Sequence, residues 1–181
     1  MWLESKNRMK IKVINIFKHF KKICTHKYWV FYYCCKMGIP LQGLIHDMSK
    51  FSLTEFWESA RYYQGTSSPI DTCKKVNGIS KAWLHHKGRN KHHYEYWFDN
   101  IDRMGGTPLE MPLKYKKEML CDFLGAGHAY YGKDFTYEKE HEWWQNKLSH
   151  PLAMHENNKK YISTYMELLN KYGEKAFKMI K

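Results

Sequence analysis

The feature that most constrains the fold of this 181-residue sequence is the recurrence of apolar residues at helical spacing. Such residues return every three or four positions between residues 8 and 37, as expected for one face of a long helix. No segment alternates apolar and polar residues convincingly enough to predict a strand. The sequence therefore predicts an all-α fold. His26 lies on or beside this apolar stripe. The residues that define the first pattern are Ile11, Ile14, Ile16, Phe17, Phe20, Ile23, Cys24, Tyr28, Phe31, Tyr32 and Cys35.

Capping and helix-breaking residues divide the rest of the chain into further predicted helices. Gly38 is a candidate C-terminal cap and Ser52 with Glu55 forms a capping-box pattern, while Asp71 and Thr136 are candidate N-caps. Gly and Pro residues favour loops at 64–69 and 103–108. The predicted helices span 8–37, 40–47, 53–63, 72–87, 91–100, 113–131, 137–147 and 157–171.

The net charge of +12 limits the classes of partner. A basic surface attracts anions, such as nucleotides, nucleic acids or anionic membranes, although a lysine-rich soluble surface also accounts for it. The aromatic residues are not interleaved with Lys and Arg in any recognised RNA-binding motif, so a nucleic-acid partner ranks low. We expect a small phosphorylated or nucleotide ligand.

Cysteine usage and hydropathy point to a cytoplasmic protein without a membrane partner. The cysteine count is odd and no pair has CxxC spacing, which argues against a disulfide framework or a Cys-type zinc site. The short apolar stretch 13–17 is bounded by Lys12 and Lys18, and no apolar run is long enough to span a bilayer. The cysteines are Cys24, Cys34, Cys35, Cys73 and Cys121.

Residues His46 and Asp47 are the first candidate ligands of a metal ion. An imidazole nitrogen and a carboxylate oxygen both suit Mn, Fe, Co or Zn. Lys50 follows three residues after Asp47 and supplies a charge that a phosphate can use. The run therefore indicates a metal and phosphate site, provided that further ligands come from elsewhere in the chain.

Four histidines within nine positions are the second candidate group. They form two pairs seven residues apart, which is two turns in a continuous helix. One member of each pair could therefore reach a single centre, even if Gly88 bends the segment. Asp122 lies among apolar neighbours, where a carboxylate needs a partner such as a metal. The four histidines are His85, His86, His92 and His93.

The ordered set of candidate ligands resembles the HD-domain superfamily of metal-dependent phosphohydrolases. The order is His26, then His46-Asp47, then two downstream histidines, then Asp122. The run from His46 to Lys50 is similar to the His-Asp-x-Gly/Ser-Lys variant of the superfamily signature. The stretches LIHDMSKFSLTEF, AWLHHKGRNKHHYEYW and CDFLGAGHAYYG also resemble an uncharacterised bacterial and phage family, a domain of unknown function, over roughly residues 25–150.

The superfamily resemblance implies a single-domain, HD-domain-like helical bundle over residues 1–181, with ligands projecting inward. The metal-site core would span about 20–135, and helices in 136–181 would pack on it. A mononuclear centre would use His26, His46, Asp47 and Asp122. A dinuclear centre would add one histidine of each pair, with Asp47 bridging. We favour His86 and His93, leaving His85, His92 and Glu95 as alternative ligands or as groups that orient ligands.

The activity implied is hydrolysis of a nucleotide or another small phosphoester by one or two divalent ions. A bound metal lowers the pKa of water towards about 7 and so generates a nucleophile at neutral pH. Lys50 and Arg89 are candidates to meet the phosphate charge, and His128 is a candidate substrate contact or general acid. The alternatives are an HD-type di-iron oxygenase, a non-catalytic module that sequesters an anionic nucleotide, and a nucleic-acid binder with a structural metal.

Overall fold

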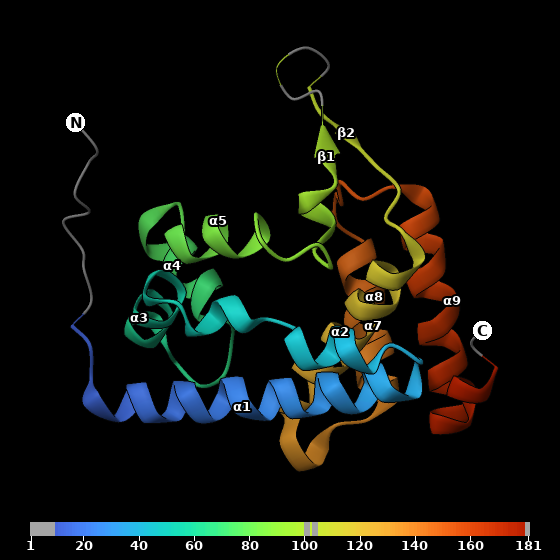
Figure 1. The fold of residues 1–181 in the computed structure, drawn as a ribbon, viewed down its shortest axis with the longest axis horizontal. Coiled ribbons are helices and arrows are strands. Elements are labelled where there is room, and N and C mark those ends of the chain that lie inside the picture. The colour runs from blue at the N-terminus through green and yellow to red at the C-terminus, as the bar shows by residue number, and fades with distance from the viewer. Residues whose placement is uncertain (1–9, 100–101, 103–104, 180–181) are drawn as a thin grey trace.

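Helix α1 (Val13–Lys36) runs along the length of the molecule, and the other helices pack beside it in two groups (Figure 1). The computed structural model describes residues 10–99, 102 and 105–179. Helices α3, α4 and α5 form one group, and α7, α8 and α9 form the other. The remaining bounds are α2 Pro40–Ile45, η1 Met48–Phe51, α3 Leu53–Tyr62, α4 Pro69–Asn77, α5 Lys81–Lys87, η2 Tyr94–Tyr96, α7 Leu113–Tyr131, η3 Gly132–Asp134, α8 Tyr137–Leu148, α9 Glu156–Tyr172 and η4 Gly173–Lys178.

The predicted all-α class is confirmed, and several helix boundaries follow the predicted capping residues. Helix α7 has the predicted bounds, and Gly38, just beyond the end of α1, adopts a left-handed φ of 73°. The side chains of Ser52 and Thr136 accept hydrogen bonds from the first turns of α3 and α8. Of the described helices, none is both long and apolar enough to cross a bilayer.

The single helix predicted over 72–87 was wrong, because two shorter helices occupy this region. Helix α4 begins at Pro69, before the expected cap Asp71, and ends where Gly78 adopts a φ of 77°. The side chain of Ser80 then caps α5 by accepting a hydrogen bond from the backbone N–H of Trp83. The left-handed glycine ends one helix, and the serine begins the next.

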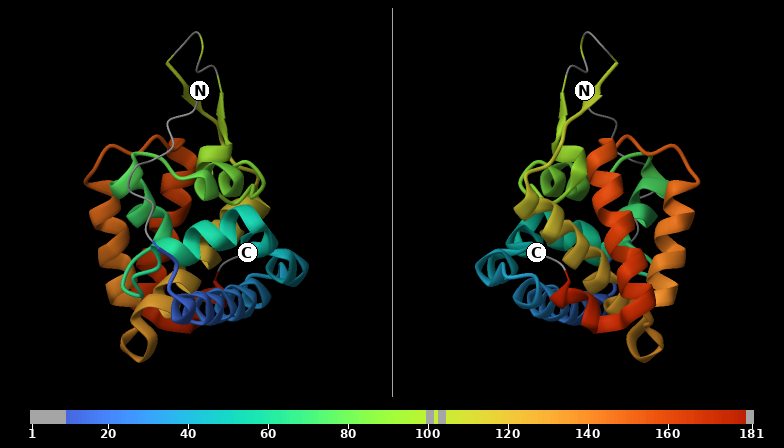
Figure 2. Two further views of the ribbon diagram at one scale, coloured as in Figure 1. Left: turned by 90° about the vertical axis from the view of Figure 1, so that its left-hand side faces the viewer. Right: turned by 90° about the vertical axis from the view of Figure 1, so that its right-hand side faces the viewer.

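The helix predicted over 91–100 was also wrong, and so was the expectation of no strand. Its described part forms the 3-10 turn η2 and the short strand β1 (Phe98–Asp99). Strand β1 pairs antiparallel with β2 (Thr107–Pro108), and the pair projects from the helices (Figure 2). Position 100 of the predicted helix lies outside the described residues.

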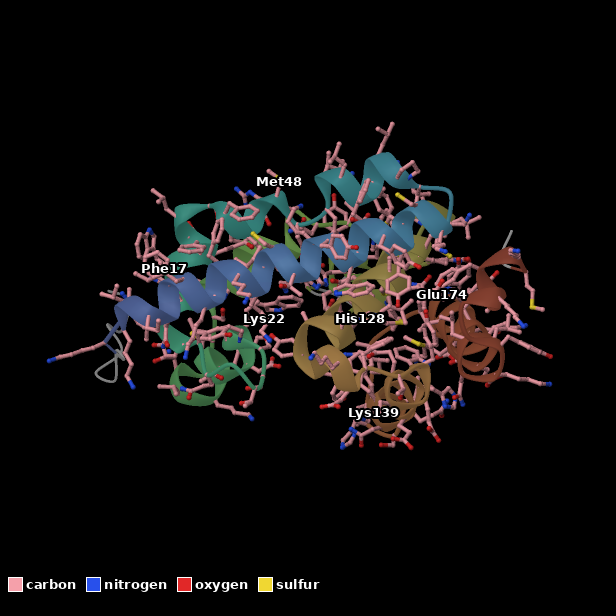
Figure 3. All side chains as sticks on the ribbon, turned by 90° about the horizontal axis from the view of Figure 1, so that it is seen from below. Phe17, Lys22, Met48, His128, Lys139 and Glu174 are labelled. Carbon is pink, nitrogen blue, oxygen red and sulfur yellow. The ribbon has the colours of Figure 1, made fainter. Side chains whose placement is uncertain are left out.

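Helix α1 is confirmed, but its buried face coincides only in part with the predicted one: Ile23 belongs to both, and His26 is buried as its place on or beside the stripe suggested. Positions 8 and 9 lie outside the described residues, and the helix begins at Val13. Phe17 is 67% exposed, although it belongs to the predicted apolar stripe. Figure 3 shows Phe17 and Met48 on one side of α1 and Lys22 on the other. The buried face, spaced by three or four residues, carries His19, Ile23, His26, Val30 and Tyr33.

Two glycines allow α2 and α7 to approach α1 closely. A Cβ atom on Gly125 of α7 would lie 2.4 Å from Cγ2 of Val30. A Cβ atom on Gly43 of α2 would lie 2.6 Å from Cβ of Cys34. Side chains at either position would force the helices apart. These contacts bring two helices against α1: α2, which is followed by His46 and Asp47, and α7, which carries Asp122.

Candidate metal centre

Four separate segments bring candidate ligands to one buried place. His26 comes from α1, His46 and Asp47 follow α2, and Asp122 comes from α7. Helix α5 and the loop after it supply histidines from the 85–93 cluster. Charged or polar side chains are rarely buried together unless they are paired or bind a metal. The most buried members are His46, Asp47, His86 and His92, each exposed by 2% or less.

The first group of ligand atoms has the spacing of a metal coordination shell. His26 Nε2 lies 3.1 Å from Asp122 Oδ1 and 3.5 Å from Asp47 Oδ2. His46 Nε2 lies 3.2 Å from Asp47 Oδ2 and 3.4 Å from both His26 Nε2 and Asp122 Oδ1. Ligands about 2.0–2.1 Å from one ion in a tetrahedron lie roughly 3.3–3.4 Å apart, so these four atoms could surround one ion.

The second group lies on the other oxygen of Asp47. Asp47 Oδ1 is 3.3 Å from His86 Nε2 and 3.4 Å from His92 Nε2, and His93 offers a further nitrogen within reach of a common ion. Asp47 is therefore placed to bridge two ions, one on each carboxylate oxygen. Of the described non-glycine residues, it alone has a positive φ (53°). Such strained backbone is often found at functional sites.

The second group contains buried polar atoms that lack hydrogen-bond partners in the described part of the chain, as expected for ligands of a metal ion. The Oδ1 atom of Asp47, together with Nε2 of His92 and of His93, is buried without a hydrogen-bond partner among the described residues. Buried polar atoms are nearly always satisfied, and leaving them unsatisfied costs about 1–3 kcal/mol each. A divalent cation would satisfy all three atoms together, so these residues suit a metal ion.

Glu118 orients two of the candidate ligands, and sequence reasoning missed it. Its Oε1 atom lies 2.9 Å from His46 Nδ1 and 3.1 Å from His92 Nδ1. Both rings can donate through Nδ1, which turns their Nε2 atoms toward the ligand groups. Carboxylates commonly fix metal-binding histidines in this way. Glu118 precedes Asp122 by four residues and so shares its helix face, a spacing that could have revealed it.

Glu55 has the same role on the opposite side of the site. Its Oε2 lies 2.7 Å from His86 Nδ1, and its Oε1 lies 2.6 Å from His85 Nδ1. The sequence predicted Glu55 only as part of a capping box. Its backbone N–H does donate to Ser52, but its carboxylate reaches α5. Glu55 thereby holds His85. The group that could hold one ion together with Asp47 consists of His86, His92 and His93.

The electrostatics favour ionised Asp47 and Glu118 and a neutral His93. Burial lowers the pKa of His46, but the carboxylates of Asp47, Asp122 and Glu118 outweigh burial and raise it well above its usual value. Burial opposes ionisation of Asp47, but His46, Lys50 and His86 outweigh it and hold the pKa of Asp47 well below its usual value. Burial likewise opposes ionisation of Glu118, but hydrogen bonds from His46 and His92 lower its pKa to about 2. Burial and the neighbouring histidines lower the pKa of His93, which is therefore a neutral imidazole at pH 7.

Lys50 connects the ligand groups to a cavity of about 220 Å³. Its Nζ atom lies 2.5 Å from Asp47 Oδ2, and its side chain remains partly exposed. Burial disfavours its charge, but Asp47 and Asp122 outweigh burial and raise the pKa of Lys50. The ligand residues that line the same cavity are His26, His86, His93 and Asp122. A small molecule in this cavity would thus meet the candidate ligands and a cation together.

Three other candidate residues belong to none of the clusters of ligand atoms. Arg89 is exposed and donates to the backbone oxygen of His85. His128 is stacked between Trp29 and Phe135, with ring centroids 3.7 and 3.6 Å away, so its position serves packing. Glu95 lies in η2, and its Oε2 is buried without a hydrogen-bond partner among the described residues. Glu55 and Glu118 orient histidines, as had been expected of Glu95.

Comparison with known proteins identifies a family but no activity. The Family of unknown function (DUF5662) matches residues 15–168, and the chain belongs to this family. The matched range contains every candidate ligand. Neither the curated proteins nor the solved structures contain a match to this chain.

Proposed function

We propose that this member of the family of unknown function is a metal-dependent phosphohydrolase acting on a nucleotide or another small phosphoester. The observation that carries the proposal is that the two carboxylate oxygens of Asp47 face different ligand groups. Its Oδ2 lies among His26, His46 and Asp122, whereas its Oδ1 lies beside His86 and His92. A carboxylate placed in this way could bridge two ions about 3.5–4 Å apart, the spacing at which two ions clamp one phosphoryl group.

A second support is the order of the ligands along the chain. His26, the His46-Asp47 pair, the downstream histidines and Asp122 occur in the order found in the HD-domain superfamily. The all-α fold and the inward projection of these side chains agree with that resemblance. We therefore propose that the family is related to HD-domain phosphohydrolases, with His86, His92 and His93 as the histidines available to the second ion.

Different groups would perform different parts of the proposed hydrolysis. When bound, divalent ions would polarise the phosphoryl group and lower the pKa of an attacking water molecule. Lys50 lies where it can contact a phosphate oxygen and offset the charge that develops during hydrolysis. Glu118 and Glu55 hold His46, His92 and His86 in fixed orientations. Apolar walls around the cavity limit access of bulk water to the reacting group.

The decisive experiment combines metal analysis with a substrate panel. We expect purified protein to hold about two equivalents of Mn, Fe, Co or Zn, as measured by elemental mass spectrometry. Asp47→Asn should lose most of this metal, because its bridging carboxylate is removed. Phosphate release from nucleotides and small phosphomonoesters should fall at least about 100-fold in the variant. Asp134→Asn, on the exposed surface, serves as the matched control.

Other outcomes would identify a different function. Iron with oxygen-dependent absorbance changes would favour a di-iron oxygenase, for which the histidine-rich ligand set is also suited. Nucleotide bound tightly and recovered unchanged by metal-loaded protein would favour a sequestering module. Protein that holds no metal after reconstitution would contradict the proposal.

A further inference from the structure

His19 lines the same cavity as Lys50 but belongs to neither ligand group. It sits on α1 seven residues before His26, a separation of roughly 10.5 Å along the helix axis. Both residues belong to the buried face of α1, and both line the cavity. His19 is only 7% exposed, and its Nδ1 atom is buried without a hydrogen-bond partner among the described residues.

Aromatic side chains pack against the ring of His19, but they offer no hydrogen-bond partner to its Nδ1 atom. The ring lies 5.4 Å from that of Phe56 and 5.7 Å from that of Tyr63, measured between centroids, and both neighbours come from the α3 region. Burial and, to a lesser extent, Lys50 lower the pKa of His19 to about 4. At neutral pH the imidazole therefore has one N–H donor and one nitrogen acceptor. An unsatisfied group of this kind is costly unless something in the cavity binds it.

Other polar groups gather in the same cavity. Ser59 of α3 and Ser68, which precedes α4, both line it. The side chain of Ser68 makes no capping bond to α4. Lys22 also lines the cavity, but its amino group donates to the backbone oxygen of Ala129 and lies over the ring of Tyr130. His19 therefore shares the cavity with two serine hydroxyl groups, and Lys22, the lysine of α1 that lines the cavity, is already hydrogen-bonded.

Aromatic and small apolar side chains line part of the cavity. Its walls include the rings of Trp83 and Tyr130 and the small side chains of Ala82, Ala126 and Ala129. Aromatic rings and alanine methyl groups offer flat surfaces, which suit a planar group. The volume of about 220 Å³ is smaller than the roughly 300–1,000 Å³ of pockets for drug-sized ligands. A dinucleotide or a nucleoside triphosphate would not be enclosed.

We infer that His19 is a specificity-determining residue that binds the far edge of a small phosphomonoester carrying a planar group with a hydrogen-bonding edge. The inference rests on the proposed function, which places the phosphate at Lys50 and the ligand groups. The planar group then lies between Trp83 and the alanines, and its polar edge meets His19 Nδ1. Aromatic amides and nucleobase edges both have this chemistry.

The test uses two non-hydrolysable probes that differ only at the far edge. Benzylphosphonate carries the anion and the ring, and 4-carbamoylbenzylphosphonate adds an amide. Calorimetry on manganese-loaded protein should show that the amide strengthens binding about 3- to 10-fold, the value of one neutral hydrogen bond. His19→Phe keeps the ring packing on Phe56 and Tyr63 and should abolish this preference. His141→Phe, on α8, is the matched control and should retain it.

A third probe separates failure of this inference from failure of the proposed function. Benzamide lacks the phosphonate, and its contact with His19 is followed by the nitrogen NMR shifts of the imidazole. If benzamide changes the nitrogen NMR shifts of His19 but the phosphonate group adds no affinity, the contact with His19 is supported and the proposed phosphohydrolase function is contradicted. If both phosphonates bind tightly and equally to the wild type and to His19→Phe, the role of His19 is overturned and the phosphate end stands. His19→Gln, which can still form a hydrogen bond, should retain part of the amide preference.

Discussion

Nδ1 of His46 lies 2.9 Å from Oε1 of Glu118, and this contact fixes which ring nitrogen of His46 faces the candidate metal centre. Both residues are almost fully buried. With Nδ1 turned to the carboxylate, Nε2 is left among His26, Asp47 and Asp122. The same oxygen of Glu118 also holds His92, so one carboxylate orients a ligand of each group.

Glu118→Gln should weaken metal binding about 10- to 100-fold without changing the ligands themselves. The neutral amide cannot accept from both imidazoles as strongly as a carboxylate, so their orientation and basicity are lost. Titration calorimetry with Mn²⁺ measures the affinity, and Glu138→Gln on the exposed side of α8 is the control. Equal affinity in Glu118→Gln and wild type would contradict the orienting role.

Replacing His85 or His86 of α5 by alanine should have very different effects on the metal content of the protein. His86 faces Asp47 through Nε2, whereas His85 is partly exposed and contacts Glu55. We expect His86→Ala to lose about one equivalent of metal, and His85→Ala to retain the wild-type content. Elemental analysis of the two purified variants decides this. A loss of metal confined to His85→Ala would show that the ligand groups are misassigned.

Gly125→Ala should destabilise the protein by about 1–3 kcal/mol through overpacking. The added methyl group would lie 2.4 Å from the Cγ2 atom of Val30, well inside van der Waals contact. Val30→Ala removes that atom and should be destabilising alone, because Val30 is fully buried. The double variant should lose less stability than the sum of the single losses. Urea unfolding measures all three, and simple additivity would argue against this contact.

Glu140→Gln should stabilise the protein at alkaline pH. Burial, with a smaller contribution from Asp122, raises the pKa of Glu140 from 4.5 to about 8. The folded state therefore holds a proton that the unfolded state releases between about pH 4.5 and 8, so stability falls as pH rises through that window. The Tm measured by thermal unfolding should fall less between pH 5 and 8 in the variant than in the wild type. A decline equal to that of the wild type would exclude Glu140 as its source.

Local chemistry in the sequence was sufficient to predict much of the helical framework. The limits of α7 and the caps at Ser52 and Thr136 follow from helix propensity and from side-chain hydrogen bonds within a few residues. The adjacent His46 and Asp47 likewise indicated where to search for a metal site. Their proximity to His26 was implied by a resemblance, and only the packing of α2 and α7 against α1 shows it.

The tertiary structure decided what depends on partners distant in the chain. Periodicity identifies a helix face but not the neighbour that covers it, so the exposure of Phe17 and the burial of His19 could not be deduced from spacing. For the same reason, the sequence left open which histidines face Asp47 and which carboxylates orient them. Glu55 and Glu118 reach histidines more than 25 residues away, and such contacts are fixed by how helices pack, since local hydrogen bonding extends only over adjacent turns.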